Sequence, residues 1–450
     1  MMDKALSKQI KWLQTWKTSE GAYNGFVVHR HDLKRMFKIH DTPWSQGPII
    51  VGYINLYEHT RDPQWLNEAI AAADLQCKRI SVTGEYIYAG YEDDRFSSLV
   101  HNSLANCALL DLSKTLINDG RDAAKYINVV KKNIDEYLIK ELWDEEFGAF
   151  RFSRIDYYSP DKTRYVVNMN SLAVESLIKL SNLINEEKYQ EYAIKIGEWM
   201  LTEQIISDDI ENGGISYSQV QPRVLISIYT ALAMRGLDDL YLLTNDPRYL
   251  EMMKAASTHL MSLVDSETNL FCHKIEEGKL FKYPEFISGA GIILKALNDT
   301  EKLTGENYDY CPILDAVLEN QLPNGGFKNF VGYNSTDNNR INGDEKVEVW
   351  EDTVPTIGWN AHIFEFLSRK VQGQIPENSM ENNKIFNNRY GYCETKNWVM
   401  IISLTNINSS ILYLTWKRLP ISIVYLSKKQ YRKILGYMAR LYRKFIRSKK

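Results

Sequence analysis

Apolar residues recur at helical spacing along most of this chain, and the amphipathic segments that they mark come in pairs. The two members of a pair are separated by a short polar turn, which predicts two helices packed as a hairpin. The predicted pairs are Pro43–His59 with Pro63–Arg79, Ser97–Leu116 with Ala123–Leu142, Ser171–Leu183 with Lys188–Ile205, Leu225–Leu243 with Pro247–Val264, and Phe286–Leu303 with Tyr308–Leu322. Two more segments, Lys4–Trp16 and Pro355–Val371, have no such neighbour.

These two unpaired segments stand at the two ends of the pattern, so they form a sixth hairpin if they pack together. A closed double ring lets all twelve helices bury their apolar stripes. We therefore predict an all-α fold, the (α/α)6 toroid or six-hairpin barrel. Polar clusters precede its inner helices, starting near Asp41, Arg95, Asn168, Gln221, Tyr283 and Asp352. The ring would gather these clusters at one end, which we call the mouth.

The domain division follows from the end of this pattern. We expect the toroid to span residues 1–371 as the catalytic domain, followed by a linker over 372–397 that is rich in Asn, with Gly, Pro and Ser. Residues 398–450 form a small C-terminal extension, first apolar with strand-like alternation and then a basic helix. The predicted extension is thus strands followed by a helix.

Charge is unevenly distributed along the chain. From Trp416 to the end there are twelve Lys and Arg and no Asp or Glu, so the net charge of −3 leaves −15 for the first 415 residues. Such an acidic body argues against nucleic acid as a partner. The basic tail surrounds an apolar stripe, which predicts binding to an anionic membrane surface. The alternative is a helix that packs this stripe against the acidic body.

The expected location is the cytoplasm, with the tail at the inner face of a membrane. The first residues contain no apolar run long enough for a signal peptide, and no stretch is long enough to cross a bilayer. The five cysteines are scattered without disulfide or metal spacing, which favours reduced thiols.

One stretch resembles a known group of proteins. Residues 43–69, "PWSQGPIIVGYINLYEHTRDPQWLNEA", are similar to the first-ring helices of unsaturated uronyl hydrolases and to the toroid part of uronyl C5-epimerases. More generally, residues 4–371 resemble six-hairpin glycosidase-like enzymes, which implies a carbohydrate substrate. Terpene-cyclase-like toroids share Gly-aromatic turns such as "NQLPNGGF", but this chain lacks their DxDD and DDxxD motifs. A terpenoid cyclase is therefore less favoured.

The candidate catalytic residues come from the mouth clusters. Glycoside hydrolysis needs a carboxylic acid and a second carboxylate, for which we propose Asp41, Asp94 and Asp352. An Asp before a helix is also an ordinary N-cap, so capping is the competing interpretation. Epimerases and lyases instead move a proton next to a carboxylate, for which His101 and Tyr283 are candidates. Further acid/base groups in these clusters are His40, Tyr91 and His362.

Substrate binding suits the aromatic, amide and guanidinium groups of the same clusters. Aromatic faces stack on sugar rings, and arginine grips a uronate carboxylate through two hydrogen bonds. The candidates are Trp44, Gln46, Arg95, Asn170, Arg223, Trp350 and Trp359. For the tryptophans, packing between hairpins is the competing interpretation. No dinucleotide, phosphate-loop, nucleophile-elbow or metal-ligand motif is present, so we expect no cofactor and no metal.

Three hypotheses follow. The first is a glycoside hydrolase-like enzyme that processes an oligo- or polysaccharide, uronate-containing or related, by carboxylate catalysis. The second is a uronyl epimerase or polysaccharide lyase at the same mouth, and the third is a non-catalytic toroid that binds glycan or protein. Hydrolysis releases a reducing end, a lyase creates an absorbing double bond, and an epimerase exchanges deuterium at C5.

Overall fold

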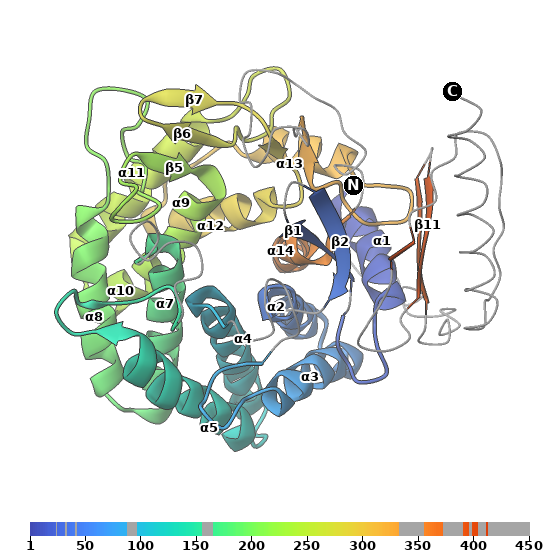
Figure 1. The fold of residues 1–450 in the computed structure, drawn as a ribbon, viewed down its shortest axis with the longest axis horizontal. Helices are drawn as coiled ribbons and strands as arrows, with labels where there is room; N and C mark the ends of the chain where they lie inside the picture. The colour runs from blue at the N-terminus through green and yellow to red at the C-terminus, as the bar shows by residue number, and fades with distance from the viewer. Residues whose placement is uncertain are drawn as a thin grey trace, which may run out of the picture. The chain divides into compact units, whose positions relative to one another are not determined.

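The computed structural model describes residues 1–23, 25–31, 34–40, 43–87, 97–154, 165–332, 355–371, 390–395, 398–403 and 411–412. Most of the described chain is helical, and the helices alternate between an inner and an outer ring (Figure 1). The inner helices are α2 (Pro43–Thr60), α4 (Leu99–Asn118), α7 (Val167–Ile184), α9 (Ser227–Ala233) continuing as α10 (Arg235–Thr244), α12 (Ala290–Thr304) and α14 (Ile357–Arg369). The outer helices are α1 (Met2–Thr15), α3 (Pro63–Lys78), α5 (Ala124–Asn133) continuing as the π-helix η1 (Ile134–Leu142), α8 (Lys188–Thr202), α11 (Pro247–Ser262) and α13 (Cys311–Glu319).

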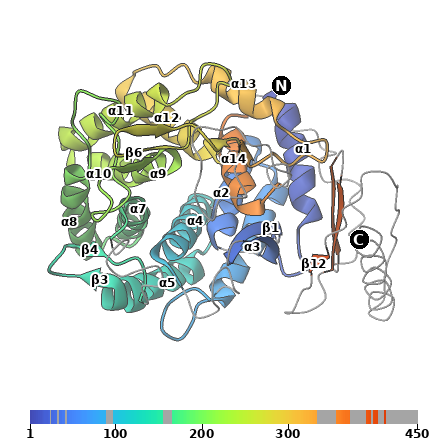
Figure 2. The ribbon, with the colours of Figure 1, turned by 45° about the horizontal axis from the view of Figure 1, so that its top comes forward.

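The inner ring is closed. Each inner helix packs against the next one in the chain, and the last, α14, packs against the first, α2 (Figures 1 and 2). A Cβ on Gly52 of α2 would lie only 2.4 Å from the Phe364 ring of α14, so the two helices are in close contact. Helix α1 packs beside α14, where the Gln9 side-chain amide donates to the Asn360 carbonyl at 2.8 Å. The predicted toroid and its closure by the first and last helices are confirmed.

The turns that lead toward the mouth repeat one design six times. Each has a residue at positive φ, and two positions later a buried, mostly aromatic residue that we call the anchor. The positive φ favours glycine because a side chain is strained there. The turn residues are Gly21, Gly84, Gly148, Gly213, Asn269 and Gly325, and the anchors are Tyr23, Tyr86, Phe150, Ile215, Phe271 and Phe327.

Fully buried amide side chains from the first turns of inner helices hold four of these anchors. In each case the amide oxygen accepts the anchor's backbone N–H, and the pairs are Gln46 with Tyr23 (3.1 Å), Asn102 with Tyr86 (3.2 Å), Asn170 with Phe150 (2.8 Å) and Asn360 with Phe327 (2.7 Å). The amide groups of Gln46, Asn170 and Asn360 also donate to the anchor's carbonyl. These clamps satisfy backbone groups that would otherwise be buried without partners.

Short sheets occupy several of the connections. The hairpin of β1 (Gly25–His31) and β2 (Lys34–His40) pairs Gly25 with His40, and it was not predicted. Its turn lacks the Asn-Gly or Gly-rich signal that marks a tight hairpin in sequence. The other pairings are β3 (Trp143–Asp144) with β4 (Ala149–Phe150), β5 (Val224–Ile226) with β6 (Lys274–Glu276) and β7 (Lys279–Phe281), and β8 (Glu285–Phe286) with β9 (Phe330–Val331).

Beyond the toroid, strands β10 (Tyr390–Thr395), β11 (Trp398–Ser403) and β12 (Ile411–Leu412) form a sheet. Strand β10 begins inside the stretch expected to be a linker, while the strands expected after residue 398 are present. The basic tail from Trp416 lies outside the described residues, so its predicted membrane role is untested. Among the helices of the described residues, none has both the length and the apolar character needed to cross a bilayer.

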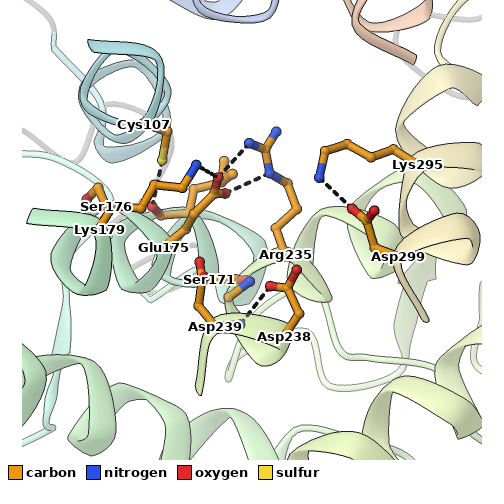
Figure 3. Close-up of polar contacts among 12 residues, drawn as sticks. Cys107, Ser171, Glu175, Ser176, Lys179, Arg235, Asp238, Asp239, Lys295 and Asp299 are labelled. Atoms are coloured by element: carbon orange, nitrogen blue, oxygen red, sulfur yellow. Dashed lines mark hydrogen bonds and ion pairs between the residues drawn. The ribbon is translucent and has the colours of Figure 1, made fainter. Parts of the chain in front are cut away.

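Charged side chains from several inner helices meet inside the ring (Figure 3). The buried Arg235 of α10 donates to Glu175 of α7 through two nitrogens, at 2.7 and 2.9 Å. Lys179 then links Glu175, at 2.8 Å, to Asp111 of α4, at 2.7 Å. Burial acts to raise the pKa of Glu175, but the charges of Arg235 and Lys179 outweigh it and hold that pKa well below its usual range.

A second group of charges faces the first from α12 and α14. Asp299 accepts from Lys295 at 2.8 Å and from Arg369 at 2.8 Å, and Arg235 lies 4.0 Å from Glu365. We call the whole set the lumen lattice; its members are Asp111, Glu175, Lys179, Arg235, Lys295, Asp299, Glu365 and Arg369. It joins inner helices α4, α7, α10, α12 and α14.

The clamps predict a stability effect at Asn170. Replacing Asn170 by Leu leaves the N–H and carbonyl of Phe150 without their side-chain partner, at a cost of about 1–3 kcal/mol in the free energy of unfolding. Urea denaturation measures this cost. Asn118→Ala, at an exposed position near the end of α4, is the control and should change stability by less than about 0.5 kcal/mol. Equal losses in the two variants would contradict the clamp role.

The lumen lattice predicts a larger effect at Arg235. Arg235→Met leaves Glu175 buried without its main partner and should cost about 3–5 kcal/mol, whereas combining it with Glu175→Leu should recover much of that loss. The exposed pair Arg248–Glu198 provides the control, because Arg248→Met should cost less than about 1 kcal/mol. The test compares the denaturant midpoints of the wild type, Arg235→Met, the double variant and Arg248→Met. If Arg235→Met loses no more stability than Arg248→Met, Arg235 has no stabilising role in the lumen lattice.

Candidate active site

The mouth lies where the inner helices begin, and its best-defined feature is the seam between the first and last of them. Trp44 of α2 and Trp359 of α14 meet edge to face, with ring centroids 5.6 Å apart. Both side chains are only partly buried. The approach depends on Gly358, where an added Cβ would lie 2.8 Å from the Trp44 ring. Closure of the helical ring therefore brings the two predicted tryptophans together.

Two phenylalanines extend this aromatic surface. Phe286 and Phe330 lie opposite each other in the β8–β9 pairing, and their ring centroids are 6.1 and 6.0 Å from that of Trp359. We call Trp44, Trp359, Phe286 and Phe330 the aromatic seam. Phe286 is buried and supports the other three rings, which are partly exposed and offer flat apolar faces that suit the apolar faces of sugars.

His362 lies directly beneath the seam. Its ring centroid is 4.5 Å from that of Trp44, and the side chain is buried. Burial, assisted by the charge of Arg235, lowers the pKa of His362 to about 3, so the imidazole is neutral at neutral pH. Its Nε2 has no hydrogen-bond partner among the described residues, while Nδ1 lies 4.0 Å from Glu365. A neutral imidazole with an unbonded nitrogen is able to accept a proton.

Two described carboxylates near the mouth, those of Asp144 and Glu285, bind other side chains and do not belong to the aromatic seam. Asp144 accepts from the Tyr165 hydroxyl at 2.5 Å and from Arg151 at 2.7 Å, and the Tyr165 bond is the main reason that its pKa falls to about 2. Glu285 is fully buried, which raises its pKa to about 7. Adjacent strand residues point to opposite faces, so Glu285 points away from the seam that holds Phe286. It accepts instead from Thr268 at 3.0 Å.

Arg223 and Tyr283, two of the predicted residues, also have other partners. Arg223 pairs with the buried Glu211, whose other oxygen accepts the Gly278 N–H at 2.7 Å. The Tyr283 side chain is buried, and an added Cβ on Gly332 would meet its ring at 2.4 Å. These contacts pack the loops that border the mouth.

The remaining predicted residues divide into two groups. Gln46 and Asn170 are the amide clamps, a role that occupies both atoms of each amide, so our proposed site leaves them out. His101 lies, partly buried, in the first turn of α4. The others lie outside the described residues, and their roles stay predictions; these are Asp41, Asp94, Arg95, Trp350 and Asp352.

The sequence analysis did not single out Phe286, Phe330 or Glu365 as site residues. A usable signal exists for α14, because Trp359, His362 and Glu365 recur every three residues in "GWNAHIFEF", so that each is a neighbour of the next on the helix surface. Among the described residues, no group of three or more His, Cys, Asp or Glu side chains is placed to hold a metal ion.

Comparisons with known proteins give a fold relationship. No family model matches the chain, and no match was found among curated proteins. Among solved structures, the chain is similar to cellobiose 2-epimerase from Bacillus thermoamylovorans B4167 at 12% identity and a TM-score of 0.59, covering 80% of this chain and 95% of that one. It is also similar to a D-mannose isomerase at 12% identity and a TM-score of 0.60, covering 82% and 97% of the two chains.

A third similar structure is an unsaturated glucuronyl hydrolase specific for heparin, at 12% identity and a TM-score of 0.56, covering 82% of this chain and 96% of that one. At such identities the likeness concerns the fold alone. The expected resemblance is confirmed at that level, because this chain has the six-hairpin (α/α)6 toroid fold of these carbohydrate-active enzymes.

Proposed function

We propose that this chain is a carbohydrate-processing enzyme whose substrate binds at the aromatic seam. The observation that carries the proposal is a neutral imidazole, that of His362, directly below two partly exposed tryptophans. Aromatic rings supply binding for a sugar, and the imidazole supplies acid/base chemistry. The fold supports the same conclusion, because the names of the similar structures given above identify them as enzymes that act on sugars or glycans.

Proton transfer at a sugar carbon is our first candidate reaction. A neutral histidine takes a proton from a carbon next to a carbonyl or carboxylate, which is the first step of epimerases, isomerases and lyases. Two similar structures are named as an epimerase and an isomerase. A uronate would offer the required acidic C–H, and Arg95 would suit its carboxylate.

Glycoside hydrolysis is the second candidate, because Asp41, Asp94 and Asp352 precede α2, α4 and α14 by only two to five residues. Helices α2 and α14 carry Trp44 and Trp359, so a carboxylate close to either helix start would be near the seam. In this reaction two of these carboxylates would act as acid and base, and Trp350 would contribute to binding. A toroid that binds glycan without turnover is the remaining alternative.

We also propose that the toroid forms a catalytic domain ending near residue 371 and that the basic tail after Trp416 attaches it to an anionic surface. Flotation with anionic vesicles at low salt tests this attachment. Full-length protein should float and protein ending at Val371 should not, and equal behaviour of the two would contradict the tail's role.

The reaction is identified by its products. With uronate-containing oligosaccharides in deuterated water, we expect deuterium to enter the sugar, as mass spectrometry would show. His362→Gln should lower that rate about 10²–10⁴-fold, the usual contribution of a general acid/base group. New reducing ends that persist in His362→Gln but vanish in the Asp41→Asn, Asp94→Asn or Asp352→Asn variants would support hydrolysis instead. No turnover on any such substrate would favour the binding alternative.

The tryptophans predict a binding effect. Trp359→Ala removes a stacking surface and should raise KM about three- to tenfold, since an aromatic contact contributes about 0.5–1.5 kcal/mol. Trp199→Ala on outer helix α8 is the control, because Trp199 donates to Glu203 at 2.8 Å and lies outside the seam. Steady-state kinetics separate the two, and a KM change shared by both variants would indicate general unfolding.

The low pKa of His362 also predicts how stability depends on pH. Its folded pKa, about 3, lies below the unfolded value near 6.5, so stability from the neutral ring is complete above pH 6.5 and falls as pH drops toward 3. Between pH 6.5 and 4.5 this group should remove on the order of 2 kcal/mol. In urea titrations at several pH values, the free energy of unfolding of His362→Gln should fall by correspondingly less over that interval. If the free energies of the variant and the wild type fall in parallel as the pH drops, His362 is not the responsible group.

A further inference from the structure

His362 is connected to the lumen lattice through a single side chain, Glu365. The two residues are three positions apart on α14, and Glu365 Oε2 lies 4.0 Å from His362 Nδ1. The other oxygen, Oε1, lies 4.0 Å from Arg235 Nη1. All three side chains are at least nine-tenths buried. Glu365 therefore stands between the mouth imidazole and the central guanidinium.

Arg235 is shared unequally between its two carboxylates. Its Nε and Nη2 bind Glu175 at 2.7 and 2.9 Å, whereas only Nη1 faces Glu365, at the longer distance. Glu365 Oε1 has no hydrogen-bond partner among the described residues. Glu365 lies 4.0 Å from Arg235 Nη1 through one oxygen and 4.0 Å from His362 Nδ1 through the other, so it faces both groups without a hydrogen bond to either.

The backbone beneath Glu365 is fixed independently of its carboxylate. The Asn55 amide of α2 donates to the Glu365 carbonyl at 3.2 Å and to the Ser368 hydroxyl at 3.1 Å. The Ser368 hydroxyl also donates to the Glu365 carbonyl, at 2.9 Å. This part of α14 therefore keeps its place on α2, and the carboxylate is free to serve another purpose.

We infer that Glu365 and Arg235 are positioning residues for His362: Glu365 favours the ring proton on Nδ1, and Arg235 keeps the resting ring neutral. A carboxylate facing Nδ1 favours the N–H on that nitrogen, which leaves Nε2 as the proton acceptor. The positive guanidinium opposes a second proton on the ring. This inference deepens the proposed function, on which its catalytic consequence rests.

Other titratable groups lie around this trio. They are Asp111 of α4, Lys179 of α7, Asp238 and Asp239 of α10, Lys295 and Asp299 of α12, and Arg369 of α14. Lys179 and Asp111 are engaged with Glu175 or each other, and Lys295 and Arg369 with Asp299. Arg235 is thus the cation whose guanidinium lies between Glu175 and Glu365.

Histidine side-chain ¹⁵N spectra test the inference without depending on turnover. In the wild-type protein, the signal that disappears in His362→Gln should show a neutral ring protonated on Nδ1. Glu365→Gln removes the carboxylate but keeps the shape, so this signal should change to a mixture of the two neutral tautomers. Asp299→Asn makes the same chemical change elsewhere in the lumen lattice and should leave the His362 signal unchanged.

Arg235 is tested by removing its charge together with that of its partner. In the double variant Arg235→Met with Glu175→Leu, Glu365 faces His362 without an opposing cation. The pH midpoint of the His362 signal should then rise by at least one unit. A midpoint that stays where it is in the wild type overturns the role of Arg235, and an unchanged tautomer in Glu365→Gln overturns the role of Glu365.

Turnover distinguishes this inference from the proposed function. If both hold, Glu365→Gln should lower deuterium incorporation about tenfold or more and shift its pH profile, while Asp299→Asn should alter neither beyond its effect on stability. A changed tautomer with unchanged turnover would support the positioning of His362 and remove His362 from the reaction. An unchanged tautomer with reduced turnover would overturn the inference and leave the proposed site intact.

Discussion

Arg235 is a permanently charged group held in the middle of a ring of helices, and its burial imposes conditions on every neighbouring helix. A buried guanidinium needs carboxylates at well-defined positions, which Glu175 of α7 provides at hydrogen-bond distance and Glu365 of α14 at longer range. Glu175 in turn requires Lys179, and Lys179 requires Asp111. Ion pairs of this kind contribute little net stability, but wrong helix packing leaves a charge buried alone. The lumen lattice therefore selects one arrangement of the ring.

The mouth is organised by a different interaction. Amide clamps fix four of the segments that arrive from the outer helices. Among the described residues, Trp44, Trp359 and His362 have no part in these clamps and meet at the seam. Buried backbone N–H and carbonyl groups need hydrogen-bond partners, so the clamp amides serve the structure. The side chains at the seam are not needed for that purpose and are available to a ligand.

Periodicity predicted the helices well because every inner and outer helix must bury a stripe, and the stripe is visible in sequence. It predicted ring closure because Lys4–Trp16 and Pro355–Val371 had no other partners. The contacts that each polar side chain makes within the ring were harder to predict from the sequence. An amide such as Gln46 has the same signature whether it binds a sugar or the Tyr23 backbone, and only the distances separate the two roles. The hairpin of β1 and β2 was missed because its turn has no distinctive residues, and Glu365 was missed because its importance comes from Arg235, which is 130 positions away.

The aromatic seam exists only when the ring is closed. Trp44 belongs to the first inner helix and Trp359 to the last, so their contact joins residues more than 300 positions apart. Contacts of such separation cost the most chain entropy and are expected to form late in folding. The Asn55 amide, which fixes α14 on α2, and the Gln9 amide, which binds α1 to α14, secure this same junction. A loosened junction would separate Trp44 of α2 from Trp359 and His362 of α14, so the candidate site depends on the contact between the two ends of the ring.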